Sequence, residues 1–226
     1  AVVVLAGLMN ALKVVGKKKE SITVVINGAG AAGIATAKML YNYGVKEIVV
    51  VDTSGAIYEG RAEGMNPFKE QIASYTNQGK KKGKLAEVIP STDVFIGVSK
   101  AGVLTAAMVK SMNPEPVIFA MANPVPEIMP GEAKEAGAAV VATGRSDFPN
   151  QINNSLAFPG IFRGALDSKA TQITESMKLA AAHALASLVP SPSADMIVPE
   201  PLDRSIVPAV SKAVADAAIK SGVVRK

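Results

Sequence analysis

Short apolar runs alternate with segments of helical periodicity along most of the chain, and this alternation predicts its architecture. Five runs have the length and the branched aliphatic content of buried strands, over residues 23–27, 47–51, 93–97, 117–121 and 138–142. Strands that alternate with helices pair in parallel through right-handed crossovers. We therefore expect an α/β fold built on a doubly wound parallel sheet.

Helical periodicity fills the intervals between these strands and both ends of the chain. The expected helices cover residues 1–16, 31–43, 67–76, 105–112, 130–136, 173–188 and 207–221. Gly44 is suited to end the second helix and Pro67 to begin the third. We expect a helix over residues 1–18 that links to an N-terminal domain outside this sequence, a central domain over residues 19–166, and C-terminal helices over residues 167–226 that pack on that domain.

The composition narrows the kind of core and the kind of chemistry. Hydrophobic residues make up 49% of the chain, but only 4% is aromatic and Trp is absent. Small residues must therefore fill the core, which suits helices packed closely on a parallel sheet. The absence of cysteine excludes disulfide bonds, a thiolate nucleophile and a cysteine-ligated metal. It also suits a reducing cytoplasm, where we expect the protein to act.

The net charge of +5 does not indicate a nucleic-acid partner. Lysines are spread along the chain, and the one cluster, at residues 80–84, has no interleaved aromatic residues, which favours a solvated loop. The apolar first segment contains Asn10 and Lys13 and is shorter than the roughly 20 residues of a membrane span. We therefore predict a buried helix there and no membrane partner.

A glycine-rich segment joins the first predicted strand to the helix after it. Gly28, Gly30 and Gly33 form this segment, and Asp52 follows the second strand, 22 residues after Gly30. In a dinucleotide-binding unit such glycines permit a tight turn, the approach of a pyrophosphate to a helix N-terminus, and close helix–strand packing. An acid about 20 residues further on accepts the ribose hydroxyls. The predicted cofactor-binding residues are Gly28, Ala29, Gly30, Ala31, Ala32, Gly33 and Asp52.

Polar residues also gather just after the strands, where ligands of an open parallel sheet bind. Asn123 follows the fourth predicted strand, and Pro124 keeps it out of the helical region. Its carboxamide could contact a carboxylate or a ribose, or the Asn-Pro pair could simply begin a turn. Asn153 and Asn154 lie in a non-periodic segment, where they could bind a ligand or cap a helix.

Four motifs together resemble those of the malic enzymes in order and spacing. They are Gly28-Ala-Gly-Ala-Ala-Gly33, Asp52 with Gly60-Arg61, Met121-Ala-Asn-Pro124, and Asn153-Asn-x-x-x-Phe-Pro-Gly160. The likeness extends over residues 1–167 and more loosely through the C-terminal helices. It implies a Rossmann-like NAD(P)-binding domain of the short bacterial or archaeal type, with flanking N- and C-terminal helices.

The resemblance also implies an activity, the NAD(P)-dependent oxidative decarboxylation of L-malate to pyruvate and CO2, with Mg²⁺ or Mn²⁺ bound in the complete enzyme. By motif match, Asn123 and Asn154 contact the malate, Asn123 also lies near the nicotinamide riboside, and Asn153 supports its loop. The apolar first helix and the Ala-rich C-terminal helices suit contacts between subunits or domains, so we expect a homo-oligomer.

The general acid, general base and metal ligands of the malic enzymes are implied to lie in a preceding catalytic domain. We therefore expect no catalytic or metal-binding residue in this chain. Lys100, which follows a predicted strand, is the one alternative for the base. The single histidine, His183, lies in an Ala- and Leu-rich helical pattern and is predicted to pack there. Asp147 is predicted to be a turn residue rather than a metal ligand.

The choice of cofactor and the class of function each have an alternative. Asp52 favours NAD, because a carboxylate repels the 2′-phosphate of NADP, but Lys69 or Arg61 could bind that phosphate and admit NADP. Another two-domain dehydrogenase, such as an amino-acid dehydrogenase, is a second reading, against which the asparagine motifs argue. A non-catalytic NAD-binding or NAD-sensing domain is a third, which the missing acid, base and metal ligands favour.

Overall fold

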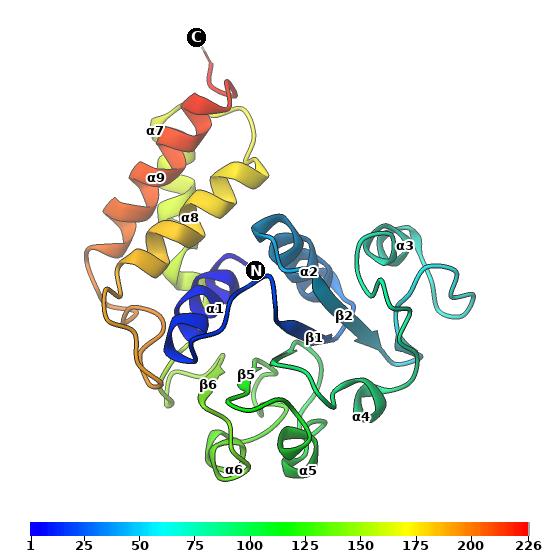
Figure 1. The fold of residues 1–226 in the computed structure, drawn as a ribbon. Helices are drawn as coiled ribbons and strands as arrows, with labels where there is room; N and C mark the ends of the chain where they lie inside the picture. Colours follow the sequence, from blue (N-terminus) through cyan, green and yellow to red (C-terminus); the bar gives the residue numbers. More distant parts are fainter. Residues whose placement is uncertain (226) are drawn as a thin grey trace.

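A six-stranded sheet forms the centre of the molecule in the computed structural model, which describes residues 1–225 (Figure 1). The strands are β1 Thr23–Asn27, β2 Glu47–Asp52, β3 Gly55–Ala56, β4 Val94–Gly97, β5 Val117–Ala120 and β6 Val140–Thr143. Their order is β3-β2-β1-β4-β5-β6. All neighbours pair in parallel except β3, which is antiparallel to β2. The predicted doubly wound parallel sheet is confirmed, with β3 as an unpredicted antiparallel edge.

The helices cover both faces of this sheet. They are α1 Val2–Val14, α2 Ala31–Tyr43, α3 Pro67–Ala73, α4 Leu85–Val88, α5 Ala106–Lys110, α6 Pro130–Glu135, α7 Phe158–Asp167, α8 Glu175–Ser187 and α9 Ile206–Lys220, with a 3₁₀ turn η1 at Asn154–Leu156. In Figure 1, α1 and α2 lie on one face and α4, α5 and α6 on the other. Val24 and Ile26 of β1 pack with the first group, and Val25 packs with the second. This alternation explains why the strands are apolar throughout.

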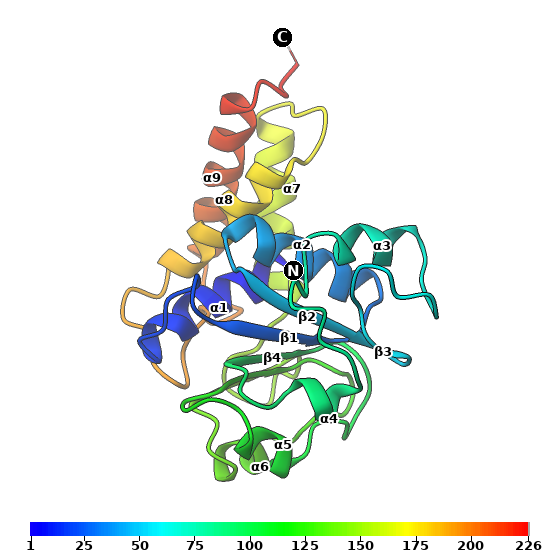
Figure 2. The ribbon, with the colours of Figure 1, turned by 45° about the vertical axis from the view of Figure 1, so that its right-hand side comes forward.

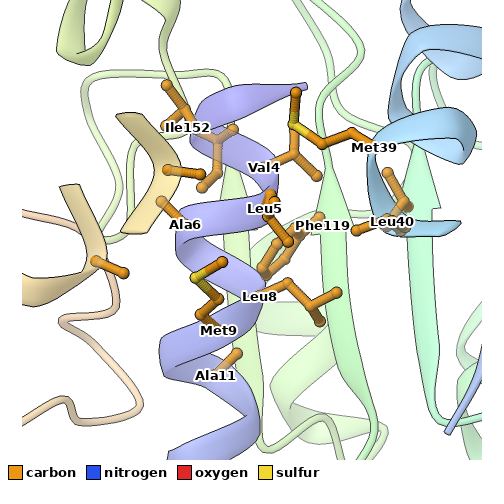
Figure 3. Packing of buried hydrophobic residues seen from close by; sticks show 14 of the residues in the cluster. Val4, Leu5, Ala6, Leu8, Met9, Ala11, Met39, Leu40, Phe119 and Ile152 are labelled. Atoms are coloured by element: carbon orange, nitrogen blue, oxygen red, sulfur yellow. The ribbon is translucent and has the colours of Figure 1, made fainter. Parts of the chain in front are cut away.

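Helix α1 is part of the core. Ten consecutive residues, from Val3 to Leu12, are buried. Figure 3 shows Leu5 and Leu8 directed toward Phe119 of β5, with Met39 of α2 beside Val4. The one polar residue in this stretch, Asn10, is fully buried and donates hydrogen bonds to the carbonyls of Ala186 at 2.9 Å and Ile197 at 3.0 Å. Its two amide hydrogens are therefore satisfied by the C-terminal part of the chain.

The three C-terminal helices form a bundle that projects beyond the sheet (Figure 2). Helix α9 packs against both α7 and α8, and α8 packs against α1. A single hydrophobic cluster extends from α1 through one face of the sheet to Val214 and Ala218 of α9. Among residues 1–225, no helix has both the length and the apolar content that crossing a membrane requires. The domain limits at residues 18 and 166 stay a prediction.

Four elements were not predicted from the sequence: α7, α4, β3 and the 3₁₀ turn η1. In helix α7, Pro159 stands in the first turn, where the missing N–H costs no helical hydrogen bond. Helix α4 and strand β3 were not predicted, because four and two residues are too short to show a periodicity. The predicted elements are otherwise present, with bounds that differ by up to three residues.

Candidate functional site

A crevice opens beyond the carboxyl ends of β1 and β4, where the order of the strands reverses direction. Asn27 at the end of β1 pairs with Val51 on one side and Gly97 on the other. In open α/β sheets this reversal leaves the loops on either side free to diverge, which creates a binding cleft. The cavity here is about 690 Å³. It is lined by Gly28, Ala29, Gly30, Asp52, Lys69, Ser99 and Lys100, among others.

The glycine loop has the geometry that its sequence requires. Gly28 has a φ of +119°, and a Cβ there would meet the carbonyl oxygen of Val98 at 2.5 Å. A Cβ on Gly33, in the first turn of α2, would overlap the carbonyl of Gly28. Gly30, the N-cap of α2, has no atom within 4 Å of such a position and faces open space. The backbone amides at the start of α2 are thus accessible to an anion such as a pyrophosphate.

Ala29 lines the same crevice, and Ala31 and Ala32 are exposed in the first turn of α2. Of the predicted cofactor-binding residues, Gly28, Ala29, Gly30 and Asp52 therefore line the cavity, whereas Ala31, Ala32 and Gly33 follow in the first turn of α2.

Asp52 is held by two cations. Arg61 donates from Nη1 to Oδ1 at 2.9 Å and from Nη2 to Oδ2 at 2.6 Å, and Lys69 donates from Nζ to Oδ2 at 2.6 Å. The backbone N–H of Ser54 donates to Oδ1 at 2.8 Å. The side chains of Asp52 and Arg61 are only 8% and 6% exposed. Arg61 and Lys69 were predicted as possible ligands of a 2′-phosphate, and in this structure both bind the Asp52 carboxylate.

This arrangement determines the charge of the site. Burial alone would raise the pKa of Asp52, but the hydrogen bonds from Arg61, Lys69 and Ser54 outweigh it and hold the pKa well below its usual range. The same contact with Asp52 raises the pKa of Arg61. Asp52 is therefore ionised at neutral pH. Because two cations face one carboxylate, the cluster carries a net charge of about +1.

Three residues at the crevice were not singled out from the sequence. Asn27, Lys84 and Ser99 all line it. The Nδ2 of Asn27 donates to the Oγ of Ser99 at 2.8 Å, and the Nζ of Lys84 donates to the carbonyl of Thr53. Two of the three carried a signal of position: Asn27 immediately precedes Gly28, and Ser99 follows the predicted strand 93–97. Lys84 ends the lysine cluster that was predicted to be a solvated loop, so its place at the crevice was not expected. Lys100, the alternative base, is exposed on this rim.

The three asparagines of the predicted substrate site lie elsewhere. Asn123 is exposed beyond the end of β5. Asn153 is the N-cap of η1, and its Oδ1 accepts from the N–H of Ser155 at 3.0 Å. Asn154 is exposed and lines a second cavity, of about 600 Å³, with Ala1 and Phe158. Within residues 1–225 the dinucleotide crevice includes none of the three asparagines.

The two other residues that the sequence analysis considered, His183 and Asp147, contact side chains of this domain. His183 is exposed on α8, and its ring is edge-on to that of Tyr43, with the ring centroids 6.0 Å apart. Partial desolvation lowers the pKa of His183, with a smaller contribution from Lys19. Asp147 is exposed and paired with Arg145 at 2.6 Å. In the described part of the chain, no three His, Cys, Asp or Glu residues come together in a way that could hold a metal ion.

The family model and the most similar relatives of this chain identify the same protein family. The family model for the malic enzyme NAD-binding domain matches residues 1–223. The bifunctional malic/malolactic enzyme of Bacillus subtilis strain 168 is 62% identical over 100% of this chain and 55% of its own length. The NAD-dependent malic enzyme of Geobacillus stearothermophilus is 52% identical over 100% of the chain and 47% of its own length. Other relatives are named NADP-dependent malic enzymes.

Solved structures agree with this result. The crystal structure of malic enzyme from Pyrococcus horikoshii Ot3 superposes with a TM-score of 0.96 at 47% identity, over 100% of this chain and 54% of that one. The chain thus spans about half the length of the Bacillus subtilis, Geobacillus stearothermophilus and Pyrococcus horikoshii relatives. With its glycine loop and Asp52 at the crevice of a Rossmann-like sheet, the chain belongs to the malic enzyme family, as its NAD-binding domain.

Proposed function

We propose that the protein carrying this domain catalyses the oxidative decarboxylation of L-malate to pyruvate and CO2 with NAD or NADP. The observation that carries the proposal is the crevice that joins the glycine loop to Asp52, in a chain whose relatives are named malic enzymes. A bound nicotinamide ring supplies the hydride acceptor for malate oxidation. The residues of this domain bind and orient the two ligands.

Each part of the crevice has a defined task in this proposal. The amides from Gly28 to Gly33 bind the pyrophosphate at the N-terminus of α2. Asp52 accepts hydrogen bonds from the adenosine ribose. Asn123, at the end of a more distant strand, donates to the malate and to the nicotinamide riboside, and Asn154 contacts the malate from the start of η1. Asn153 keeps η1 in place through its cap.

Both cofactors fit the charge of the site. The carboxylate of Asp52 favours the free ribose hydroxyls of NAD. Lys69 lines the crevice beside it, so its ammonium group can turn to a 2′-phosphate while Arg61 keeps Asp52 paired. We propose that NAD is the preferred cofactor and that Lys69 allows the use of NADP.

The rest of the machinery belongs to other parts of the protein in this proposal. A catalytic domain supplies the acid, the base and the ligands of a divalent metal, which agrees with a chain that spans about half the length of the Bacillus subtilis relative. The assembly is a homo-oligomer, supported by the exposed apolar residues Phe158, Phe162 and Leu166 of α7. We place the protein in the cytoplasm, which a chain without cysteine suits.

A direct assay tests the proposal. The purified full-length protein, supplied with L-malate, Mg²⁺ or Mn²⁺, and either NAD or NADP, should form reduced cofactor and pyruvate in equal amounts. Lactate is measured in parallel, because the Bacillus subtilis relative is named a bifunctional malic/malolactic enzyme. If dinucleotide binds but only amino acids are oxidised, an amino-acid dehydrogenase replaces the proposal. If dinucleotide binds and no substrate reacts, a sensing domain replaces it.

A further inference from the structure

A buried carboxylate, Glu127, joins two loops at the carboxyl end of the sheet. Its side chain is fully buried. Oε1 accepts a hydrogen bond from the backbone N–H of Ser99 at 2.9 Å and lies 3.3 Å from the Ser99 hydroxyl. Oε2 accepts from the N–H of Ala122 at 2.9 Å. Buried glutamates are rare in proteins without a partner that offsets their desolvation, and here the partners are the donors of two loops.

The two loops are the ones that the proposed function uses. Ser99 lines the dinucleotide crevice after β4, and Ala122 immediately precedes Asn123 after β5. The Ser99 hydroxyl also accepts from Asn27, the residue before the glycine loop, at 2.8 Å. A hydrogen-bonded network centred on Glu127 therefore crosses the ends of three adjacent strands, β1, β4 and β5.

The sheet leaves space for this carboxylate at Gly97, the last residue of β4. The three heavy atoms nearest to a Cβ built on Gly97 all belong to the Glu127 carboxyl group, and all lie within 2.7 Å. A side chain at this position would displace the carboxylate. The buried Glu127 carboxylate therefore fits only because residue 97 is a glycine.

We propose that Glu127 is a positioning residue that fixes the nucleotide-side loop at Ser99 relative to the malate-side loop at Asn123. This inference rests on the proposed function of those loops. A rigid link between them sets the distance from the nicotinamide to the malate, and a displacement of about 1 Å can cost 10²-fold in rate. The role requires a carboxylate, since both oxygens must accept. A glutamine would present its NH₂ to one of the two backbone donors.

The test compares Glu127→Gln with Asp93→Asn in the full-length protein. Asp93 is a matched control, because it accepts from the N–H of Thr23 at 2.8 Å and from Lys17 and Asn113, but at the opposite, amino end of the same strands. Glu127→Gln should lower kcat/KM for malate by roughly tenfold or more and raise the KM for NAD. Asp93→Asn should lower stability and leave both constants within about twofold of wild type.

Gly97→Ala displaces the same carboxylate by a different substitution, because its methyl group would overlap the Glu127 carboxyl group. This variant tests the proposal if Glu127→Gln does not fold. It should reproduce the loss in kcat/KM. In a Glu127→Ala background it should add no further loss, because the atoms that its methyl group meets are absent. Kinetic constants that change no more in Glu127→Gln or Gly97→Ala than in Asp93→Asn would overturn the proposal.

A measurement independent of turnover separates this inference from the proposed function. If the wild-type protein does not oxidise malate, the proposed function fails. The role of Glu127 is then tested by hydrogen exchange at the backbone amides of Ser99 and Ala122, compared between wild type and the variants. Loss of protection at both amides in Glu127→Gln, together with weaker NADH binding, supports the positioning role. Equal protection in Glu127→Gln and Asp93→Asn refutes it.

Discussion

Arg61 engages both oxygens of Asp52 in a side-on pair, with Nη1 2.9 Å from Oδ1 and Nη2 2.6 Å from Oδ2. With Ser54 and Lys69 the carboxylate accepts four hydrogen bonds, about as many as its lone pairs allow. A ribose can therefore bind Asp52 only by replacing one of these donors. Lys69 is the one that lies on the crevice, whereas Arg61 is buried behind the carboxylate. We therefore expect the affinity for each cofactor to depend on the position of Lys69.

Asp52→Ala should weaken NAD binding and reduce any preference for NAD over NADP. The loss of each charge-assisted bond to the ribose costs on the order of 1.5–3 kcal/mol at most. The substitution also leaves Arg61 and Lys69 without their counter-ion, which favours a 2′-phosphate. Calorimetric titration with both cofactors measures the two affinities, and unchanged values would remove Asp52 from the site.

Lys69→Ala should weaken the binding of NADP and leave NAD binding unchanged or tighter. The variant removes the ammonium group that can reach the 2′-phosphate and frees one acceptor position on Asp52 for a ribose hydroxyl. Lys110→Ala, at the last turn of α5, is the control for a general loss of positive charge. Equal losses for both cofactors in Lys69→Ala would contradict the assignment.

Asn154→Ala and Asn153→Ala should separate substrate binding from helix capping. In the full-length enzyme Asn154→Ala should impair malate turnover and leave NAD affinity intact, because its side chain lies away from the dinucleotide crevice. Asn153→Ala should lower the free energy of unfolding by about 0.5–2 kcal/mol through the lost cap. Kinetics and urea denaturation of both variants give the comparison. A stability loss in Asn154→Ala that matched the loss in activity would favour a structural role for this residue as well.

The stability of the domain should fall in acid, in part through Asp93. Burial alone would raise the pKa of Asp93, but hydrogen bonds from Thr23, Lys17 and Asn113 lower it below its usual value. A lowered pKa in the folded state contributes stability above the unfolded value of about 3.9, and that contribution is lost as the pH falls from there toward the folded pKa. Urea denaturation from pH 6 to pH 3 should therefore show a flatter acid limb in Asp93→Asn than in wild type, at about constant slope m. Parallel curves would exclude this contribution.

The sequence predicts most of the sheet and little of the polar network around it. The bounds of β1 and α2 are correct, because an apolar run precedes the glycines and Gly44 ends the helix with a φ of +106°. Helix α7 was missed altogether, since Pro159 and Gly160 are also typical of loops. Hydrophobic periodicity reports which face of an element is buried. It does not report which polar groups meet there.

The contacts of Asp52 and Glu127 illustrate this limit. The sequence shows a cation nine residues after Asp52, but the turn between them decides whether Arg61 faces the carboxylate or the solvent. Glu127 has no charged partner that a motif could reveal, because its donors are backbone amides and a hydroxyl. A charged residue is assigned to the surface by default. Only the three-dimensional positions of Ser99 and Ala122 identify it as buried.

The burial of α1 has a consequence for how this protein is made. The amide of Asn10 binds carbonyls that lie 176 and 187 residues later in the chain. At about 5–20 residues per second, a ribosome exposes this apolar helix on the order of ten seconds or more before the C-terminal residues that Asn10 binds have emerged. Throughout that interval the face of the helix that packs on α8 is a target for chaperones and for aggregation. Truncated nascent chains that stop before α8 should therefore be retained by hydrophobic-binding chaperones and released once residue 197 has cleared the exit tunnel.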